Sequence, residues 1–163
     1  KDKILCAKFR KGHFEGVLDV MNKLTKIINP QKIFMGEKDF QQLYLVKKQL
    51  ERTYKTKVIP CKTIRDRNNV ALSSRNLLLN KSSIVIAAKI YKKLVSIKKN
   101  IKNKKKISSF LNLKKKELKN NYKIKIDYLE LRNINNLKIS NTKKNSRLFI
   151  AYYLNNVRLI DNL

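Results

Sequence analysis

The spacing of apolar residues predicts a helix near the start of the chain and a strand directly after it. Apolar positions recur every three or four residues at Phe14, Val17, Met21, Leu24 and Ile28. This spacing is that of an amphipathic helix, and the Asn29-Pro30 pair is expected to end it. Residues 32–35 have the sequence Lys-Ile-Phe-Met, which predicts a short buried strand.

A second helix and a second strand follow closely. Leu43, Val46 and Leu50 have helical spacing, and Asp39 and Gln42 are spaced like an N-terminal capping box. Residues 57–60 then predict another strand. A strand, a helix and a strand within about thirty residues form a βαβ unit, whose right-handed crossover makes the strands parallel. Ligands of such sheets bind beyond the carboxyl ends of the strands, so we expect a ligand near residues 36–39.

The pattern changes after Asn80. Residues 84–95 and 107–118 predict two helices with a lysine-rich connection between them. The alternation in residues 122–131 changes face after Tyr128, which indicates a strand with a bulge. Two more strands are predicted at 147–154 and 157–160, and the Asn155-Asn156 pair between them suits a tight turn. We therefore predict a domain boundary near Leu78, with domains 1–77 and 78–163, the second a small α+β domain with an antiparallel sheet.

Composition restricts the class of protein. The 163 residues are 42% hydrophobic and 31% charged, which is enough apolar material for a folded core. No apolar run approaches the roughly 18 residues that span a bilayer. Cys6 and Cys61 have neither CxxC spacing nor a neighbouring histidine. We therefore expect a cytoplasmic protein with no membrane partner, no disulfide and no metal ligands among its site residues.

The net charge of +29 would ordinarily indicate nucleic acid as a partner. However, 32 of the 40 basic residues are lysine, whereas base-reading surfaces depend mainly on the bidentate arginine fork. The densest lysine runs, 98–106 and 114–116, also lack the interleaved aromatic residues of a stacking surface. Both observations favour a solvated basic surface. Non-specific nucleic-acid binding or a scaffold role by an inactive lysine-rich fragment is kept as the alternative function.

The first candidate site is the segment from Gly36 to Gln42. Gly36 allows a ligand to approach the backbone, Lys38 offers a mobile cation for phosphate, and Asp39 can accept a hydrogen bond from a ribose or cap the helix. Gln42 lies one turn further on the same helix face, where it can bind a polar substrate. From spacing alone, an ordinary strand-to-helix turn with a capping aspartate fits equally well.

The second candidate site lies within residues 64–76, which have the sequence IRDRNNVALSSRN. The hydroxyls of Ser73 and Ser74, followed by the guanidinium of Arg75, have the donors of a phosphate clamp. Placed after a strand, this clamp would meet a triphosphate or the pyrophosphate leaving group. A serine-rich helix cap is the structural alternative, and the spacing favours neither.

Together and in this order, the two segments resemble the nucleotide-binding segments of the pantothenate synthetases, also called pantoate–β-alanine ligases. The resemblance begins with Arg-Lys-Gly-His-Phe-Glu-Gly-Val at 10–17 and includes Gly-Glu-Lys-Asp at 36–39 and Leu-Ser-Ser-Arg-Asn at 72–76. It ends with Arg-Leu-Ile-Asp-Asn at 158–162, and only residues from about 98 to 121 match in helical character alone. It implies an α/β fold: the remnant of a Rossmann-like nucleotidylyltransferase domain with a parallel sheet, followed by the small α+β domain.

The resemblance also implies an activity. Members of this family condense pantoate with β-alanine at the expense of ATP, through a pantoyl adenylate, and release pyrophosphate and then AMP. Magnesium and a homodimer are expected with it. The implied ATP contacts are Gly36, Glu37, Lys38, Asp39, Ile64, Leu72, Ser73, Ser74 and Arg75, with Ile64 beside the adenine. Gln42 falls on a pantoate contact, and Lys38, Ser73, Ser74 and Arg75 are the implied catalytic residues.

The chain departs from the family pattern at a few positions. Lys11 replaces a usual proline, and Asn69 replaces a usual glycine. Asparagine adopts the left-handed conformation more readily than other non-glycine residues, so the loop around Asn69 is expected to keep its form. The family's His-x-Gly-His segment, which supplies the catalytic proton donor, does not occur in the sequence, and His13 is interpreted as a helix-entry or packing residue. The resemblance thus implies the phosphate side of an adenylating site.

Overall fold

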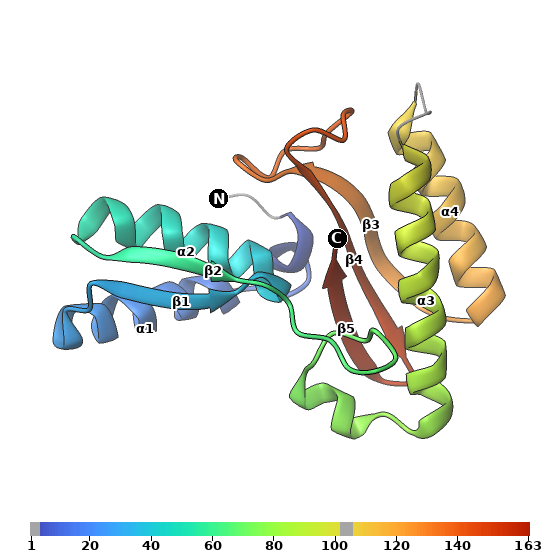
Figure 1. The fold of residues 1–163 in the computed structure, drawn as a ribbon, viewed down its shortest axis with the longest axis horizontal. Coiled ribbons are helices and arrows are strands. Elements are labelled where there is room, and N and C mark those ends of the chain that lie inside the picture. The colour runs from blue at the N-terminus through green and yellow to red at the C-terminus, as the bar shows by residue number, and fades with distance from the viewer. Residues whose placement is uncertain (1–3, 102–105) are drawn as a thin grey trace. The chain divides into compact units, whose positions relative to one another are not determined.

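The chain forms two compact units that divide between Thr63 and Ile64. The structure is a computed structural model that describes residues 4–101 and 106–163 (Figure 1). Part of the predicted lysine-rich connection, 102–105, lies outside the described residues. The predicted domain boundary near Leu78 stays a prediction, and residues 64–77 pack within the second unit.

The first unit contains the predicted βαβ arrangement. Its elements are η1 (Leu5–Lys8), α1 (His13–Ile28), β1 (Lys32–Gly36), η2 (Glu37–Asp39), α2 (Phe40–Thr53) and β2 (Lys57–Cys61). The strands pair in parallel, with Ile33 beside Val58. Helix α1 ends where Asn29 takes a left-handed conformation, with φ of 49°. The predicted helices, strands and parallel pairing are thus confirmed.

The prediction that β1 is buried is wrong. Val46, Leu50 and Val58 form the core of this unit at 0–1% exposure, and Ile33 and Met35 pack against it. Successive side chains of a strand point to opposite faces, so the residue between these two, Phe34, points away from the core and is 67% exposed. One face of the strand is therefore covered and the other is open.

Two helix predictions also need correction. In α1, Val17 and Met21 pack against the core, but Leu24 and Ile28 are 46% and 66% exposed, because the buried face passes through Thr25 instead. At the start of α2, the side chain of Asp39 makes no capping hydrogen bond. The chain enters α2 from the 3-10 turn η2 rather than from an extended residue, which is the usual conformation of a capping position.

The second unit is an antiparallel sheet with two helices on one side (Figure 1). Its elements are η3 (Ser74–Leu78), α3 (Lys81–Asn100), α4 (Ile107–Tyr122), β3 (Lys125–Asn133), β4 (Ser146–Leu154) and β5 (Val157–Asn162). The register shifts between Ile126 and Tyr128, which confirms a bulge in this strand but places it before Tyr128 rather than after it. Asn155 takes a left-handed conformation, with φ of 52°, in the predicted turn between β4 and β5.

Strand β4 lies in the middle of this sheet and supplies much of its core. The strand pairs with β3 on one edge and β5 on the other. Leu148 and Ile150 are 1% exposed and join Ile90 and Leu94 of α3 and Leu111 of α4 in one cluster. The amphipathic periods of α3 and α4 therefore determine which face of the sheet is covered.

A matched pair of leucines on α4 tests this packing. Replacing Leu111, which is 3% exposed, with alanine is expected to lower the free energy of unfolding by about 2–5 kcal/mol, because a cavity replaces core contacts. The control Leu113→Ala changes a residue that is 56% exposed and is expected to change that free energy by no more than about 0.5 kcal/mol. Urea unfolding followed by circular dichroism measures both values, and equal losses would contradict this description of the core.

Candidate functional site

The first candidate segment follows the carboxyl end of β1. Gly36 is exposed, and a Cβ atom added to it would meet no heavy atom within 4 Å, so the backbone there is open to a ligand. Glu37 and Lys38 are half-buried, and Asp39 is exposed. The segment forms the 3-10 turn η2 and leads into the 14-residue helix α2, so it lies at the positive end of that helix's dipole, which attracts anions. This geometry suits a phosphate or carboxylate.

Two adjacent glutamines on α2 have different environments. Gln42, the predicted pantoate contact, is half-buried. Gln41 is 7% exposed; its Oε1 accepts a hydrogen bond from the Cys6 amide at 3.0 Å, and its Nε2 donates to the Ile4 carbonyl at 3.0 Å. Gln41 therefore fixes the segment before α1 against the start of α2. Sequence reasoning did not identify this role, because both partners are backbone groups far away along the chain.

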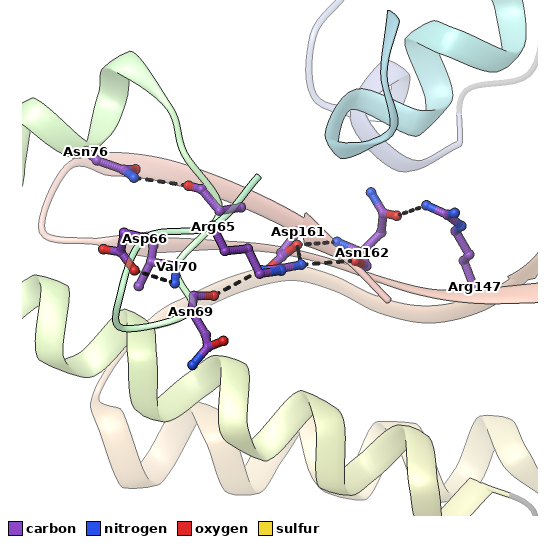
Figure 2. Close-up of polar contacts among 9 residues, drawn as sticks. Arg65, Asp66, Asn69, Val70, Asn76, Arg147, Asp161 and Asn162 are labelled. Atoms are coloured by element: carbon purple, nitrogen blue, oxygen red, sulfur yellow. Dashed lines mark hydrogen bonds and ion pairs between the residues drawn. The ribbon is translucent and has the colours of Figure 1, made fainter. Parts of the chain in front are cut away.

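The second candidate segment begins with a small hairpin. Arg65 and Ala71 form an antiparallel bridge, and the Leu72 amide donates to the Ile64 carbonyl at 3.0 Å. In the turn, Asp66 Oδ1 accepts from the amides of Asn68 and Val70 at 2.8 and 2.9 Å (Figure 2 shows the contact with Val70). Asn69 has φ of 64°, so the expected left-handed conformation is confirmed.

The serine and arginine residues follow directly after the hairpin. Val70 and Ala71 are buried, whereas Ser74 and Arg75 are exposed. The hydroxyl of Ser73 accepts from the Arg75 amide at 3.3 Å and caps η3. Ser73 therefore acts as the helix cap that the structural alternative predicts. The side chains of Ser74 and Arg75 are exposed at the surface beside it.

Apolar groups and a side-chain amide frame the same loop. Ile64 and Leu72 lie opposite each other in the hairpin and are 67% and 53% exposed, so together they present an apolar surface to solvent. Asn76 Nδ2 donates to the Ala71 carbonyl at 3.0 Å and closes the loop from its other end (Figure 2). Five predicted site residues, Ile64, Leu72, Ser73, Ser74 and Arg75, thus belong to one short structured loop.

An ion pair connects the hairpin to the last strand. Arg65 donates to both carboxylate oxygens of Asp161 on β5, at 2.7 and 2.8 Å (Figure 2). The guanidinium carbon lies 4.3 Å from the centre of the Tyr91 ring on α3. Further along the sheet, Arg147 donates to the side-chain oxygen of Asn162 at 2.7 Å. Sequence reasoning assigned no role to this network, in which Arg65 and Asp161 are 96 positions apart.

Burial and the charge of Asp161 shift the pKa values of Arg65 and Tyr152. Burial lowers the pKa of Arg65, but the hydrogen bond and negative charge of Asp161 outweigh it, so the pKa is raised overall. Tyr152 on β4 is 5% exposed, and burial, followed by the charge of Asp161, raises the pKa of its hydroxyl. The guanidinium and the phenol therefore keep their protons, and Arg65 remains a cation paired with Asp161.

Metal-ligand clusters and membrane-spanning helices are both missing from the part of the chain that the structure describes. Among residues 4–101 and 106–163, no three or more His, Cys, Asp or Glu side chains gather as ligands for a metal ion. None of the helices in those ranges has both the length and the apolar character of a membrane span.

Known proteins resemble this chain in sequence along almost its whole length. The family model described as pantoate-beta-alanine ligase matches residues 1–163. The pantothenate synthetase of Flavobacterium psychrophilum is 37% identical over 162 residues, which cover 96% of this chain and 56% of that protein. The pantothenate synthetase of Cytophaga hutchinsonii is 38% identical over 99% of this chain and 59% of that protein.

Solved structures give the same result. A pantothenate synthetase from Thermus thermophilus superposes with a TM-score of 0.88 at 28% identity, over 99% of this chain and 59% of that one. A pantoate-beta-alanine ligase from Francisella tularensis, complexed with beta-gamma ATP and beta-alanine, gives 0.72 at 34% identity, over 99% and 54%. The chain therefore belongs to the pantoate-beta-alanine ligase family, and it spans between half and three fifths of the length of these relatives.

The buried hydroxyl of Tyr152 predicts a pH dependence of stability. A tyrosine in the unfolded chain ionises near pH 10, whereas the folded pKa is higher, so above about pH 10 the unfolded state binds fewer protons. The free energy of unfolding should therefore fall as the pH rises past that value. Tyr152→Phe removes this contribution, and urea unfolding between about pH 8 and pH 11 should show the variant losing less stability than the parent. Parallel curves for the two proteins would contradict the prediction.

Proposed function

We propose that this chain carries the ATP- and pantoate-contacting portion of an enzyme that condenses pantoate with β-alanine to give pantothenate. Membership of the family supports the reaction. The observation that carries the assignment is the exposed Ser74-Arg75 pair, presented on a loop that hydrogen bonds and an ion pair hold in place. A fixed arrangement of donors is what binding a polyphosphate requires, since a flexible loop would lose entropy on binding.

In the first unit, we assign ATP contacts to Gly36, Glu37, Lys38 and Asp39, and a pantoate contact to Gln42. The open backbone at Gly36 and the start of α2 support this assignment, because helix N-termini attract phosphate. Lys38 is assigned the role of stabilising phosphate charge. Gln42 offers both an amide donor and an amide acceptor to a hydroxy acid.

In the second unit, we assign the β- and γ-phosphates to Leu72, Ser73, Ser74 and Arg75, and the adenine to Ile64. The exposed Arg75 can meet phosphate oxygens with two parallel hydrogen bonds. The exposed side chain of Ile64 suits the flat apolar face of a base. The proposed nucleotide-binding domain, residues 1–77, then includes the loop that packs within the second unit.

The proposed reaction has two steps. An oxygen of the pantoate carboxylate attacks the α-phosphorus of ATP, the bond to the bridging oxygen breaks, and pyrophosphate leaves. The amine of β-alanine then attacks the carbonyl carbon of the pantoyl adenylate, and AMP leaves. Negative charge grows on the bridging and leaving oxygens in the first step, so Lys38, Ser73, Ser74 and Arg75 are proposed to stabilise that transition state.

We further propose that the enzyme uses magnesium, forms a homodimer and works in the cytoplasm. Mg²⁺ in nucleotide enzymes is held by substrate phosphates together with one or two carboxylates, so we propose that it enters with ATP. The Francisella tularensis relative was crystallised with beta-gamma ATP and beta-alanine, which supports both as ligands for this chain.

Removing the proposed phosphate contacts tests the assignment. Lys38→Ala and Arg75→Ala are each expected to slow pantoate-dependent pyrophosphate release by about 100- to 1,000-fold, the effect of removing one oxyanion donor. The assay mixes the chain with the part of the Flavobacterium psychrophilum relative that the chain does not span. Lys48→Ala on α2 and Arg67→Ala in the hairpin are the controls, because each removes an exposed cation outside the assigned contacts. Unchanged rates in Lys38→Ala and Arg75→Ala would refute their assigned roles.

One observation favours the second candidate function, non-specific nucleic-acid binding. An open depression of about 900 Å³ at the end of α4 and the start of β3 is lined by Lys115, Lys119, Lys123 and Lys125, together with Asn120, Ile124 and Ile126. If this depression binds nucleic acid, the affinity for duplex DNA should fall steeply with salt, with a slope of about −0.9 per phosphate neutralised. Fluorescence anisotropy with a labelled duplex measures that slope, and absence of binding near physiological salt excludes this function.

A further inference from the structure

The ion pair between Arg65 and Asp161 has the properties of a rigid tie. Its two side chains are 16% and 10% exposed, and both carboxylate oxygens accept hydrogen bonds from the guanidinium. A bidentate pair of this kind fixes direction as well as distance, because the arginine fork is planar. Asp161 Oδ1 also accepts from the Asn162 amide at 2.8 Å, which fixes the carboxylate relative to its own strand.

Arg65 is held on its remaining sides as well. The Tyr91 ring lies against the guanidinium, and Arg65 donates to the carbonyl oxygen of Asn69 at 3.1 Å. Each contact occupies a part of the guanidinium that a ligand would otherwise use. Arg65 is therefore poorly suited to bind a phosphate itself, although it lies only ten positions before Arg75 in the sequence.

The hairpin connects Arg65 to the segment 72–75, which contains Ser73, Ser74 and Arg75. Arg65 bridges Ala71, and the Ala71 carbonyl accepts from the Asn76 side chain at 3.0 Å, so both ends of segment 72–75 are attached to the same residue. Between those ends, the Ser73 hydroxyl caps the Arg75 amide. Displacing Arg65 would release one end of the segment, while β5 and α3 kept their places.

We propose that Arg65 and Asp161 are positioning residues, which hold the loop 72–75 in the conformation that binds the nucleotide phosphates. This inference rests on the proposed function, since it assigns the loop a phosphate ligand. The physical basis is preorganisation. When only a fraction of molecules has the competent loop, the apparent affinity falls by that fraction. The ion pair therefore acts on ATP binding without touching ATP.

The test is ATP binding by the full chain, measured by isothermal titration calorimetry with magnesium present. Asp161→Asn keeps the size of the side chain but removes the charge and one acceptor, and Arg65→Lys keeps the charge but removes the fork. Each is expected to weaken ATP binding about tenfold, corresponding to a competent loop population of about one tenth. Hydrogen exchange at the amides of Leu72 and Asn76 should become faster in both variants.

A second ion pair of the same unit provides a matched control. Arg158 on β5 donates to Asp127 on β3 at 2.8 Å, and the two side chains are 18% and 2% exposed, close to the values for Arg65 and Asp161. Asp127→Asn breaks a comparable pair that lies outside the contacts holding loop 72–75. It is expected to lower stability while leaving ATP affinity and the exchange of Leu72 and Asn76 unchanged.

The outcomes separate the two proposals. If the parent chain binds no ATP, either alone or mixed with the part of the Flavobacterium psychrophilum relative used in the pyrophosphate assay, the proposed function is wrong and the positioning role is lost with it. If the parent binds ATP but Asp161→Asn binds equally well, or if Asp127→Asn weakens binding as much as Asp161→Asn does, the positioning role alone is refuted. Weaker binding and faster exchange in Arg65→Lys and Asp161→Asn, with Asp127→Asn unchanged, would establish it.

Discussion

The packing of α3 and α4 onto one side of the three-stranded sheet is the interaction on which the second unit depends. It buries Leu148 and Ile150 of the middle strand and holds β5 along the edge of that strand. Strand β5 in turn carries Asp161, and Asp161 holds Arg65 at the base of the candidate loop. Apolar burial has no directional preference, but it holds in place an ion pair whose geometry is strictly directional. The ion pair, and not the apolar packing, can orient the Ser74 and Arg75 side chains toward a ligand.

The regular part of this fold could be predicted from the sequence because its signals are local. Helical spacing gives α1 and α2, the βαβ order gives parallel strands, and the change of face after Tyr128 gives a bulge in β3, although the structure places it before that residue. Burial was predicted less well, since it depends on neighbours. The apolar run Ile-Phe-Met at 33–35 resembles a strand covered on both faces, whereas the structure covers one face and leaves Phe34 at the surface.

The candidate site was predictable only in part, for a related reason. Residue types that bind phosphate can be recognised in a short motif. The left-handed conformation of Asn69 could be expected because the family resemblance implies a glycine position there and asparagine tolerates that conformation. The contacts that hold the motif in place leave no local pattern. Gln41 bonds to backbone groups 35 and 37 positions away, and Arg65 pairs with a carboxylate 96 positions away. Such partners become visible only after the chain has folded.

The chain has 11 acidic residues and 40 basic ones, and several of the carboxylates make structural hydrogen bonds. Within the described residues, several carboxylates accept hydrogen bonds from cations or from backbone amides, among them Glu51, Asp66, Glu117, Asp127, Glu130 and Asp161. Replacing one exposed lysine leaves many similar cations at the surface. Replacing Asp161, in contrast, removes the carboxylate that pairs with Arg65 within the described residues. Mutational tolerance in this chain should therefore be asymmetric, with free exchange among the exposed lysines outside the proposed site and little freedom at Asp161 and its partner Arg65.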